Sequence, residues 1–257
     1  MVNYLLKKSY LIKDLKEVNF KDLWGDHGIF TTMWIFGKPQ KILFFEKHIH
    51  NLILSLNKYG IKKKFLKKDI IKLINLNLSK NKNYNHLLRV AVNKNLISVS
   101  LRKRLHPKSN FNLKLKYIKR EKPQFKNLKY KKIIKYLSKI DNSKTDIGLI
   151  NNNKVLETGT SNLLFIKNNK VYTQTKGYYK GITLKFFKTK IKKIIKKEIL
   201  INSLKDYEEI LLIGSGKGVA SVKTIQQIGW KRKSLNQYRI FSKYYRSAIN
   251  NCNIHRY

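Results

Sequence analysis

Residues 156–165, with the sequence LETGTSNLLF, place one carboxylate before small hydroxyl side chains and then an apolar run. The chain has only 14 acidic residues, so Glu157 at the end of a predicted strand is conspicuous. A carboxylate in this position can pair with the protonated ring nitrogen of a bound group, and it can equally belong to a polar turn. The following run, 163–166, has the length and apolar character of a buried strand. The stretch predicts two strands, the turn that joins them and one candidate binding residue.

The composition is that of a folded chain. Its 257 residues are enough for one large domain or two modest ones, and 42% of them are hydrophobic, well above the range of disordered chains. No apolar run approaches the roughly 20 residues that cross a bilayer, and Lys7 and Lys8 interrupt the N-terminus, so we expect a cytoplasmic protein. The single cysteine, Cys252, excludes a disulfide framework and a cysteine-based metal site, and we expect no metal.

The net charge of +43 invites a nucleic-acid interpretation, because basic surfaces bind phosphate backbones. The excess is mostly lysine, however, and it is spread along the chain together with abundant Asn and Ile. Arginine, the better planar partner for phosphates and bases, is scarce. The pattern favours a compositional drift over a binding face, so we expect no specific nucleic-acid partner.

Alternating helices and strands predict an α/β (α+β) chain of two domains. Helical periodicity occurs in residues 48–60, 65–74 and 130–137, whereas strand character occurs in 87–92, 97–101, 113–118, 147–150, 163–166, 171–173, 209–213 and 219–225. Residues 121–125 contain Pro123 and lack periodicity, so we interpret them as a linker between domains 1–120 and 121–257. We also expect a tight hairpin turn at Asn168-Asn169 and a long helix after Gly181 with apolar residues up to Ile199 facing inward.

Three further stretches carry candidate chemistry. Lys126 follows the linker and precedes a predicted helix, a rigid position for an amine that bonds a cofactor aldehyde, although one lysine in this chain means little alone. Thr183 follows Gly181 at a predicted helix start, where it can bind a phosphate or simply cap the helix. The GSGKG run with Ser215 and Lys217 offers amides, a hydroxyl and an ammonium to the same anion. Its spacing and the strand after it argue against a P-loop.

In this order and at these spacings, the segments resemble the class IV aminotransferase family of pyridoxal-phosphate (PLP) enzymes. The family includes branched-chain and D-amino-acid transaminases and 4-amino-4-deoxychorismate lyase, and the resemblance covers nearly the whole chain. It implies PLP fold type IV: a small N-terminal α/β domain, a larger strand-rich C-terminal domain, PLP in the cleft between them, and a homodimer. It also implies that Lys126 holds the cofactor, that Tyr130 lies near its phenolic oxygen, that Glu157 pairs with its ring nitrogen, and that Ile182, Thr183 and Ser215 bind its phosphate.

The chain departs from the family pattern at the phosphate. Asn51 stands where the first helix of family members usually carries an arginine, a bidentate phosphate partner. Leu184 replaces a second arginine in the Gly-Ile-Thr-Arg motif. Phosphate binding must then depend on Thr183, Ser215 and backbone amides, with a mobile ammonium such as that of Lys217 as a substitute cation.

The reaction and the substrate contacts stay open between alternatives. The segment Phe30-Thr31-Thr32 resembles the lyase form of the active-site strand, where transaminases more commonly have Phe-Glu. We therefore expect a 4-amino-4-deoxychorismate lyase of folate biosynthesis, which forms 4-aminobenzoate and pyruvate from an amino-acid-type substrate. A branched-chain or D-amino-acid transaminase and a non-catalytic basic binding protein are the alternatives. Arg89, Arg102 and Arg104 are candidate ligands of the substrate carboxylate, and we select Arg104 together with Thr32.

Overall fold

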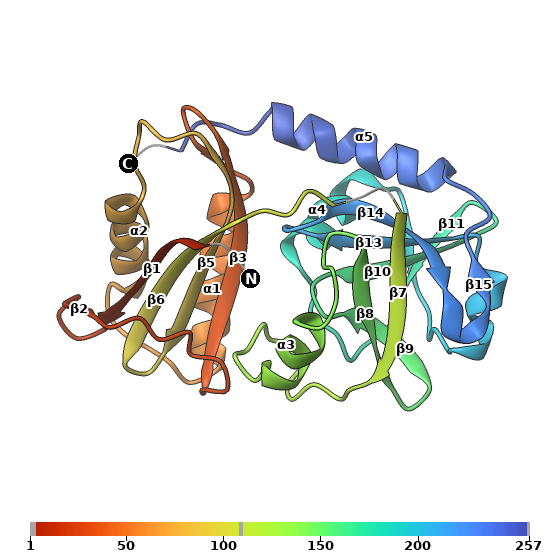
Figure 1. Cartoon of the computed structure of the whole chain (residues 1–257), viewed down its shortest axis with the longest axis horizontal. Helices are drawn as coiled ribbons and strands as arrows, with labels where there is room; N and C mark the ends of the chain where they lie inside the picture. Colours follow the sequence, from red (N-terminus) through yellow and green to blue (C-terminus); the bar gives the residue numbers. More distant parts are fainter. Residues whose placement is uncertain (1–3, 108–109, 256–257) are drawn as a thin grey trace. The chain divides into compact units, whose positions relative to one another are not determined.

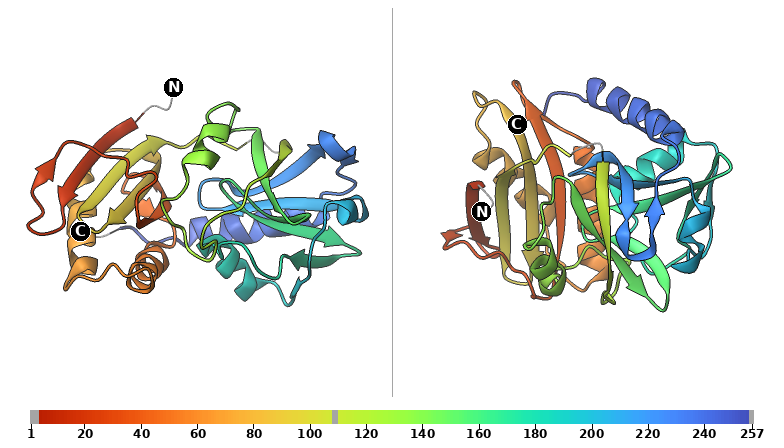
Figure 2. Two further views of the ribbon diagram at one scale, coloured as in Figure 1. Left: turned by 90° about the horizontal axis from the view of Figure 1, so that it is seen from below. Right: turned by 45° about the vertical axis from the view of Figure 1, so that its right-hand side comes forward.

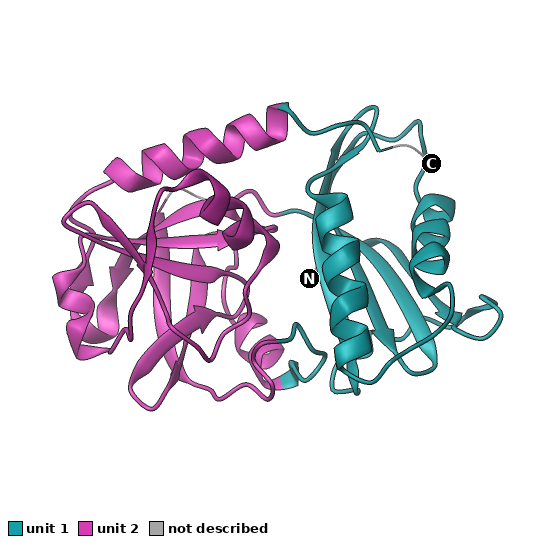
Figure 3. Ribbon diagram, turned by 180° about the vertical axis from the view of Figure 1, so that it is seen from behind, with its two compact units in different colours: residues 1–104, 125–131, 251–257 teal, residues 105–124, 132–250 magenta. Residues whose placement is uncertain are grey.

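The computed structural model describes residues 4–107 and 110–255, which belong to two compact units (Figures 1 and 3). Unit 1 comprises Met1–Arg104, Phe125–Lys131 and Asn251–Tyr257, and unit 2 comprises Leu105–Gln124 and Lys132–Asn250. The expected boundary between residues 120 and 121 falls within the 105–124 segment of unit 2. The segment Phe125–Lys131, which contains Lys126, belongs to unit 1, although Lys126 follows the expected linker in sequence.

Unit 1 is an antiparallel sheet with two helices on one face (Figure 2). Among the described residues the sheet has six strands in the order β2-β1-β6-β5-β3-β4. The elements are β1 (Tyr4–Leu11), β2 (Glu17–Val18), β3 (Gly28–Gly37), β4 (Lys41–Ile42), α1 (Phe45–Lys58), α2 (Leu66–Asn77), β5 (Tyr84–Asn93) and β6 (Leu96–Lys103).

The two helices of unit 1 follow the apolar periodicity of the sequence. Helix α1 buries Ile49, Leu52 and Leu56 against the sheet and ends before Gly60, whose φ of +83° suits a glycine. The expected helix over residues 48–60 is thus confirmed. Helix α2 begins only at Leu66, because Phe65 adopts a left-handed conformation and leaves its side chain 66% exposed, so the expected inclusion of Phe65 in the apolar face is wrong.

Unit 2 is built on a larger mixed sheet. Among the described residues it has nine strands: the order β12-β11-β10-β13-β14-β7-β8-β9, with β15 paired to β14. The elements are β7 (Asn110–Tyr117), α3 (Lys131–Leu137), β8 (Thr145–Asn151), β9 (Lys154–Thr158), β10 (Asn162–Lys167), β11 (Lys170–Thr173), α4 (Ile182–Lys190), β12 (Ile194–Lys196), η1 (Asn202–Asp206), β13 (Glu209–Gly214), β14 (Gly218–Ile225), η2 (Gln226–Ile228), β15 (Trp230–Lys231) and α5 (Asn236–Asn250).

One expected feature of unit 2 is confirmed and one is wrong. Asn168 and Asn169 both have positive φ and join β10 to β11 as a tight hairpin. The expected long helix after Gly181 ends at Lys190, since residues 194–196 form a parallel pairing with β11. Ile199 is buried in the sheet core. The run of isoleucines fits a helix by spacing, but β-branched side chains also favour strands, and here a neighbouring strand edge is available.

Helix α5 was not expected from the sequence. It buries Phe241 and Tyr245 and packs on β13 and β14. Its first N–H groups, those of Gln237 and Tyr238, donate to the buried carboxylate of Glu209 at 3.0 and 2.9 Å. A carboxylate at a helix N-terminus satisfies free donors and complements the helix dipole.

Candidate active site

Lys126 is fixed in unit 1 by backbone pairing with the first residues of β3. The N–H of Phe30 donates to the carbonyl of Lys126 at 2.9 Å, and the N–H of Leu128 donates to the carbonyl of Gly28 at 2.9 Å. Gly28 is required there, because an added Cβ would lie 2.3 Å from the carbonyl oxygen of Val92 and 2.6 Å from Leu128. The lysine therefore lies on a rigid element, as expected of a residue that holds a cofactor.

The Lys126 ammonium lies next to an aromatic cluster of unit 1. Its Nζ lies 5.1 Å from the centroid of the Phe30 ring. The Tyr130 ring meets Phe30 edge-on at a centroid distance of 5.5 Å, and Trp24 does so at 4.9 Å. The structure therefore brings the two predicted residues Lys126 and Tyr130 to the same aromatic cluster. The backbone pairing of residues 126–128 with the start of β3 fixes this placement.

His48 is a site residue that the sequence analysis did not identify as such. It lies on α1, is buried, and its Nδ1 is 2.8 Å from the hydroxyl oxygen of Thr31 on β3. Burial, and then the positive charge of Lys126, lower the pKa of His48 to about 3. The imidazole is therefore neutral at physiological pH and adds no positive charge beside Lys126.

Thr32 lies on the opposite face of β3 from Thr31, because successive side chains alternate across a strand. It is in register with Arg89 on β5. The Arg89 guanidinium lies 3.7 Å from the centroid of the Trp24 ring and 5.5 Å from that of Phe30. Lys126 and Arg89 thus share the Phe30 ring, and burial lowers the pKa of Arg89 only to about 10, which leaves it charged at neutral pH.

Arg104, the predicted substrate residue, lies elsewhere on unit 1. It follows β6, is buried, and stacks over the Trp34 ring with its guanidinium carbon 4.1 Å from the centroid. Arg89 is the arginine in register with Thr32 and next to the Lys126 cluster. Within unit 1 the geometry therefore favours Arg89 over Arg104 as the guanidinium associated with Lys126.

In unit 2 the predicted Glu157 forms a buried ion pair with Arg120. The pair joins Arg120 Nη1 to Glu157 Oε1, and the two side chains are 4% and 5% exposed. The other carboxylate oxygen accepts the N–H of Tyr179 at 3.3 Å. Arg120 precedes the linker and shares no motif with Glu157, so only the fold identifies it as a partner. The guanidinium stabilises the ionised form of the carboxylate.

The N-terminus of α4 has the properties of an anion site. The hydroxyl of Thr183 is buried and has no hydrogen-bond partner among the described residues. The N–H of the N-cap residue Gly181 donates to the side chain of Asn162 at 3.0 Å, which fixes the entry to the helix. The predicted Ile182 is the first residue of α4 and is also buried. Thr183 makes no capping hydrogen bond, so the capping interpretation is not supported.

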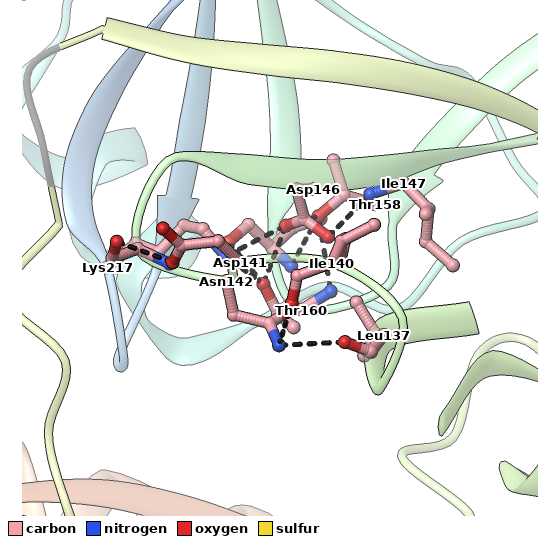
Figure 4. A network of polar contacts seen from close by, with 11 residues as sticks. Leu137, Ile140, Asp141, Asn142, Asp146, Ile147, Thr158, Thr160 and Lys217 are labelled. Atoms are coloured by element: carbon pink, nitrogen blue, oxygen red, sulfur yellow. Dashed lines mark hydrogen bonds and ion pairs between the residues drawn. The ribbon is translucent and has the colours of Figure 1, made fainter. Parts of the chain in front are cut away.

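Ser215 lies in the turn between β13 and β14, and α4 packs against β13. The neighbouring Lys217 does not supply the mobile ammonium that we expect from the sequence. Its Nζ donates to the buried carboxylate of Asp146 at 3.0 Å and to the hydroxyl of Thr160 at 2.6 Å (Figure 4). Because both side chains are buried inside unit 2, a Lys217 ammonium paired with Asp146 is more stable there than an unpaired one.

No helix in residues 4–107 or 110–255 is both long and apolar enough to span a membrane. In the same ranges, no group of three or more His, Cys, Asp and Glu side chains has an arrangement that could hold a metal ion.

Solved structures of low sequence identity share this fold. A branched-chain aminotransferase from Thermoproteus uzoniensis has a TM-score of 0.78 and 13% identity, with 96% of each chain covered. A protein described as a 4-amino-4-deoxychorismate lyase from Legionella pneumophila has a TM-score of 0.73 and 17% identity, over 92% of this chain and 98% of that chain. The PLP form of a branched-chain amino acid aminotransferase from Thermobaculum terrenum has a TM-score of 0.73 and 15% identity, over 95% and 94%. No curated protein sequence matches the chain significantly.

The model of the amino-transferase class IV family matches residues 28–225, well over half of the chain. The chain belongs to the class IV aminotransferase family, whose members are PLP-dependent enzymes. Fold type IV, expected from the resemblance, is therefore confirmed.

The residues of this chain fit PLP in their chemistry. An amine on a rigid segment, a buried ionised carboxylate and a buried hydroxyl at a helix N-terminus match the cofactor's aldehyde, its ring nitrogen and its phosphate. The hydroxyl of Thr183 supports the fit most directly, because a buried donor without a partner is costly unless a ligand satisfies it.

Proposed function

We propose that Lys126 binds PLP covalently through its Nζ, that Glu157 faces the ring nitrogen, and that Ile182, Thr183 and Ser215 bind the phosphate. Tyr130 is proposed to lie near the phenolic oxygen. The observation that carries this proposal is the pairing of Lys126 with β3, because the pairing fixes a lysine on a rigid segment beside an aromatic cluster. Bound PLP supplies an electron sink for the electrons of a substrate Cα–H bond.

The protein's own groups have distinct roles in this proposal. The Nζ amine of Lys126 would take the proton from the substrate Cα. Arg120 stabilises the charge of the Glu157 carboxylate, so that this carboxylate can hold the ring-nitrogen proton. The neutral imidazole of His48 adds no positive charge beside Lys126 and lies 2.8 Å from the Thr31 hydroxyl, which orients the two side chains.

The reaction we propose is that of a 4-amino-4-deoxychorismate lyase, which forms 4-aminobenzoate and pyruvate. Its support is the Phe30-Thr31 pair, which stands where transaminases more commonly have Phe-Glu; the hydroxyl of this threonine lies 2.8 Å from Nδ1 of the neutral His48. Thr32, on the other face of β3, is in register with Arg89 and brings no carboxylate to it, so a substrate carboxylate can bind this guanidinium. A branched-chain or D-amino-acid transaminase is the second candidate, because amino-acid-type substrates fit the family and branched-chain aminotransferases are among the similar structures. We further infer a homodimer, as the resemblance implies, and a cytoplasmic location, as expected from the sequence.

The test begins with the cofactor. We expect visible absorbance when PLP is added to the purified protein and, after borohydride reduction, a phosphopyridoxyl mass on the peptide that contains Lys126. Lys126→Ala should lose both signals and all turnover. The control is Lys129→Ala, since the Lys129 ammonium donates to the carbonyl of Gly25 at 2.8 Å and is not the proposed site. Colour retained in Lys126→Ala would contradict the assignment.

The second stage separates the activities. Release of 4-aminobenzoate and pyruvate from 4-amino-4-deoxychorismate supports the lyase, whereas amino transfer from an amino acid to a 2-oxo acid without that release supports a transaminase. A protein that stays colourless with PLP and retains RNA at moderate salt would instead support a basic binding protein.

A further inference from the structure

Lys217 lies in a tight turn, and its side chain is directed into unit 2. Strands β13 and β14 are paired as far as Gly214 and Gly218, so only three residues, including Ser215, form the turn. Gly218 has a φ of +68°, and a Cβ added to it would lie 2.5 Å from the ring of Tyr245. The Lys217 side chain is only 8% exposed. Both the backbone and the side chain at this end of the hairpin are therefore constrained.

The partner of Lys217 is Asp146, a fully buried residue of β8 (Figure 4). One carboxylate oxygen of Asp146 accepts bonds from Lys217 at 3.0 Å, Thr158 at 2.7 Å and Thr160 at 2.7 Å. The other accepts the N–H of Ile147 at 2.8 Å. The Thr160 hydroxyl, which donates to the carboxylate, also accepts from Lys217 at 2.6 Å. The ammonium, the carboxylate and the hydroxyl thus form a closed triangle.

This triangle connects two turns of unit 2. Thr158 is the last residue of β9, directly after Glu157, and Thr160 lies in the turn between β9 and β10, whereas Lys217 belongs to the turn that carries Ser215. The turns are in contact at Gly214, where an added Cβ would lie 3.0 Å from the Ser161 hydroxyl and 3.1 Å from the Thr160 carbonyl. Asp146 is therefore the common anchor of both turns.

We propose that Lys217 is a positioning residue: by binding Asp146 and Thr160 it fixes the Ser215 turn relative to the turn that follows Glu157, and it does not bind the phosphate itself. The inference rests on the proposed roles of Ser215 and Glu157 in PLP binding. The physical reason is burial, since the Asp146 and Lys217 side chains are 0% and 8% exposed. Removing the ammonium leaves the Asp146 carboxylate buried without its countercharge.

A double-mutant cycle tests the positioning role. Lys217→Met should weaken PLP binding about tenfold when Ser215 is present and less than about twofold in a Ser215→Ala background, because the effect is transmitted through Ser215. PLP dissociation constants are measured from the visible absorbance. Lys167→Met is the matched control, since it breaks an exposed ion pair of unit 2, Lys167–Asp206 at 3.2 Å, and should leave PLP binding unchanged. Equal losses in both backgrounds would overturn the proposal and make Lys217 an independent phosphate ligand or a general stabiliser.

Backbone amide exchange of the PLP-free protein tests the same inference without the cofactor. In Lys217→Met, exchange in residues 214–218 should be at least about tenfold faster than in the natural protein, with no change in Lys167→Met. If Lys217→Met does not fold, Lys217→Met with Asp146→Asn removes both charges and should show the same faster exchange. Unchanged exchange would overturn the positioning role. If the natural protein binds no PLP, the proposed function fails, while the exchange experiment still decides the role of Lys217.

Discussion

Arg120 and Glu157 form an ion pair that is almost completely buried within unit 2, with exposures of 4% and 5%. Breaking a buried pair from one side leaves an uncompensated charge, so Arg120→Met should lower the free energy of unfolding by about 3–5 kcal/mol. Urea denaturation of the PLP-free protein measures this loss. Adding Glu157→Gln to Arg120→Met should recover part of it, because the buried charge is then removed as well.

The control for this prediction is Lys154→Met. It breaks an exposed ion pair of unit 2 with Glu198 and should cost less than about 1 kcal/mol. Equal stability losses for Arg120→Met and Lys154→Met would mean that the buried pair has no special role in stability.

His48 makes the stability of unit 1 dependent on pH. Its pKa is lowered to about 3, whereas the ordinary value of 6.5 applies in the unfolded chain. The unfolded state therefore binds more protons between these values, and the contribution of His48 is present above pH 6.5 and lost as the pH falls toward 3. His48→Gln should show a weaker dependence over this window, by up to about 1.4 kcal/mol per pH unit.

The measurement is chemical denaturation of the natural protein and of His48→Gln at several pH values between 4 and 7. Carboxylates titrate in both proteins, so the difference between the two slopes isolates the imidazole. Parallel slopes would show that His48 is not held neutral by burial.

The substitution Thr183→Val tests whether the Thr183 hydroxyl binds a ligand or has a structural role. Its hydroxyl has no partner among the described residues, so Thr183→Val should leave the stability of the PLP-free protein unchanged or slightly raised. PLP affinity should fall by roughly ten- to hundredfold, the usual range for a lost hydrogen bond to a charged group. Thermal melts and PLP titrations give the two quantities.

Thr173→Val is the comparison for this prediction. The buried hydroxyl of Thr173 donates to the carbonyl of Leu163 at 3.3 Å, so its removal should cost about 1 kcal/mol of stability and leave PLP affinity unchanged. A stability loss in Thr183→Val without any change in PLP affinity would assign Thr183 a purely structural role.

The resemblance to the family places Asn51, on α1, where an arginine is usual. Charge-assisted hydrogen bonds are about twice as strong as neutral ones, so Asn51→Arg should tighten PLP binding by roughly ten- to hundredfold. PLP dissociation is measured at two salt concentrations for both proteins. No tightening, combined with strong salt dependence of the natural protein, would mean that a lysine already supplies the charge. Equal affinity without salt dependence would contradict the equivalence of Asn51 with the family's arginine.

The sequence by itself determined what neighbouring residues encode. The apolar spacing from Ile49 to Leu56 predicted α1, and Asn168-Asn169 predicted a hairpin, because periodicity and left-handed backbone preferences are local properties. The order of the motifs around Lys126, Glu157 and Thr183 was enough to indicate the family, since each motif is a short contiguous run.

Tertiary structure alone decided the long-range partners. Arg120 is 37 residues from Glu157, and Lys217 is 71 residues from Asp146, so no local pattern pairs them. The end of α4 was decided in the same way, because the edge of β11 recruits residues 194–196 into a strand that their spacing would also allow as a helix. In each case the deciding free energy comes from burying a charge beside its partner or from pairing a strand with a free sheet edge, and both depend on which distant segments the fold brings together.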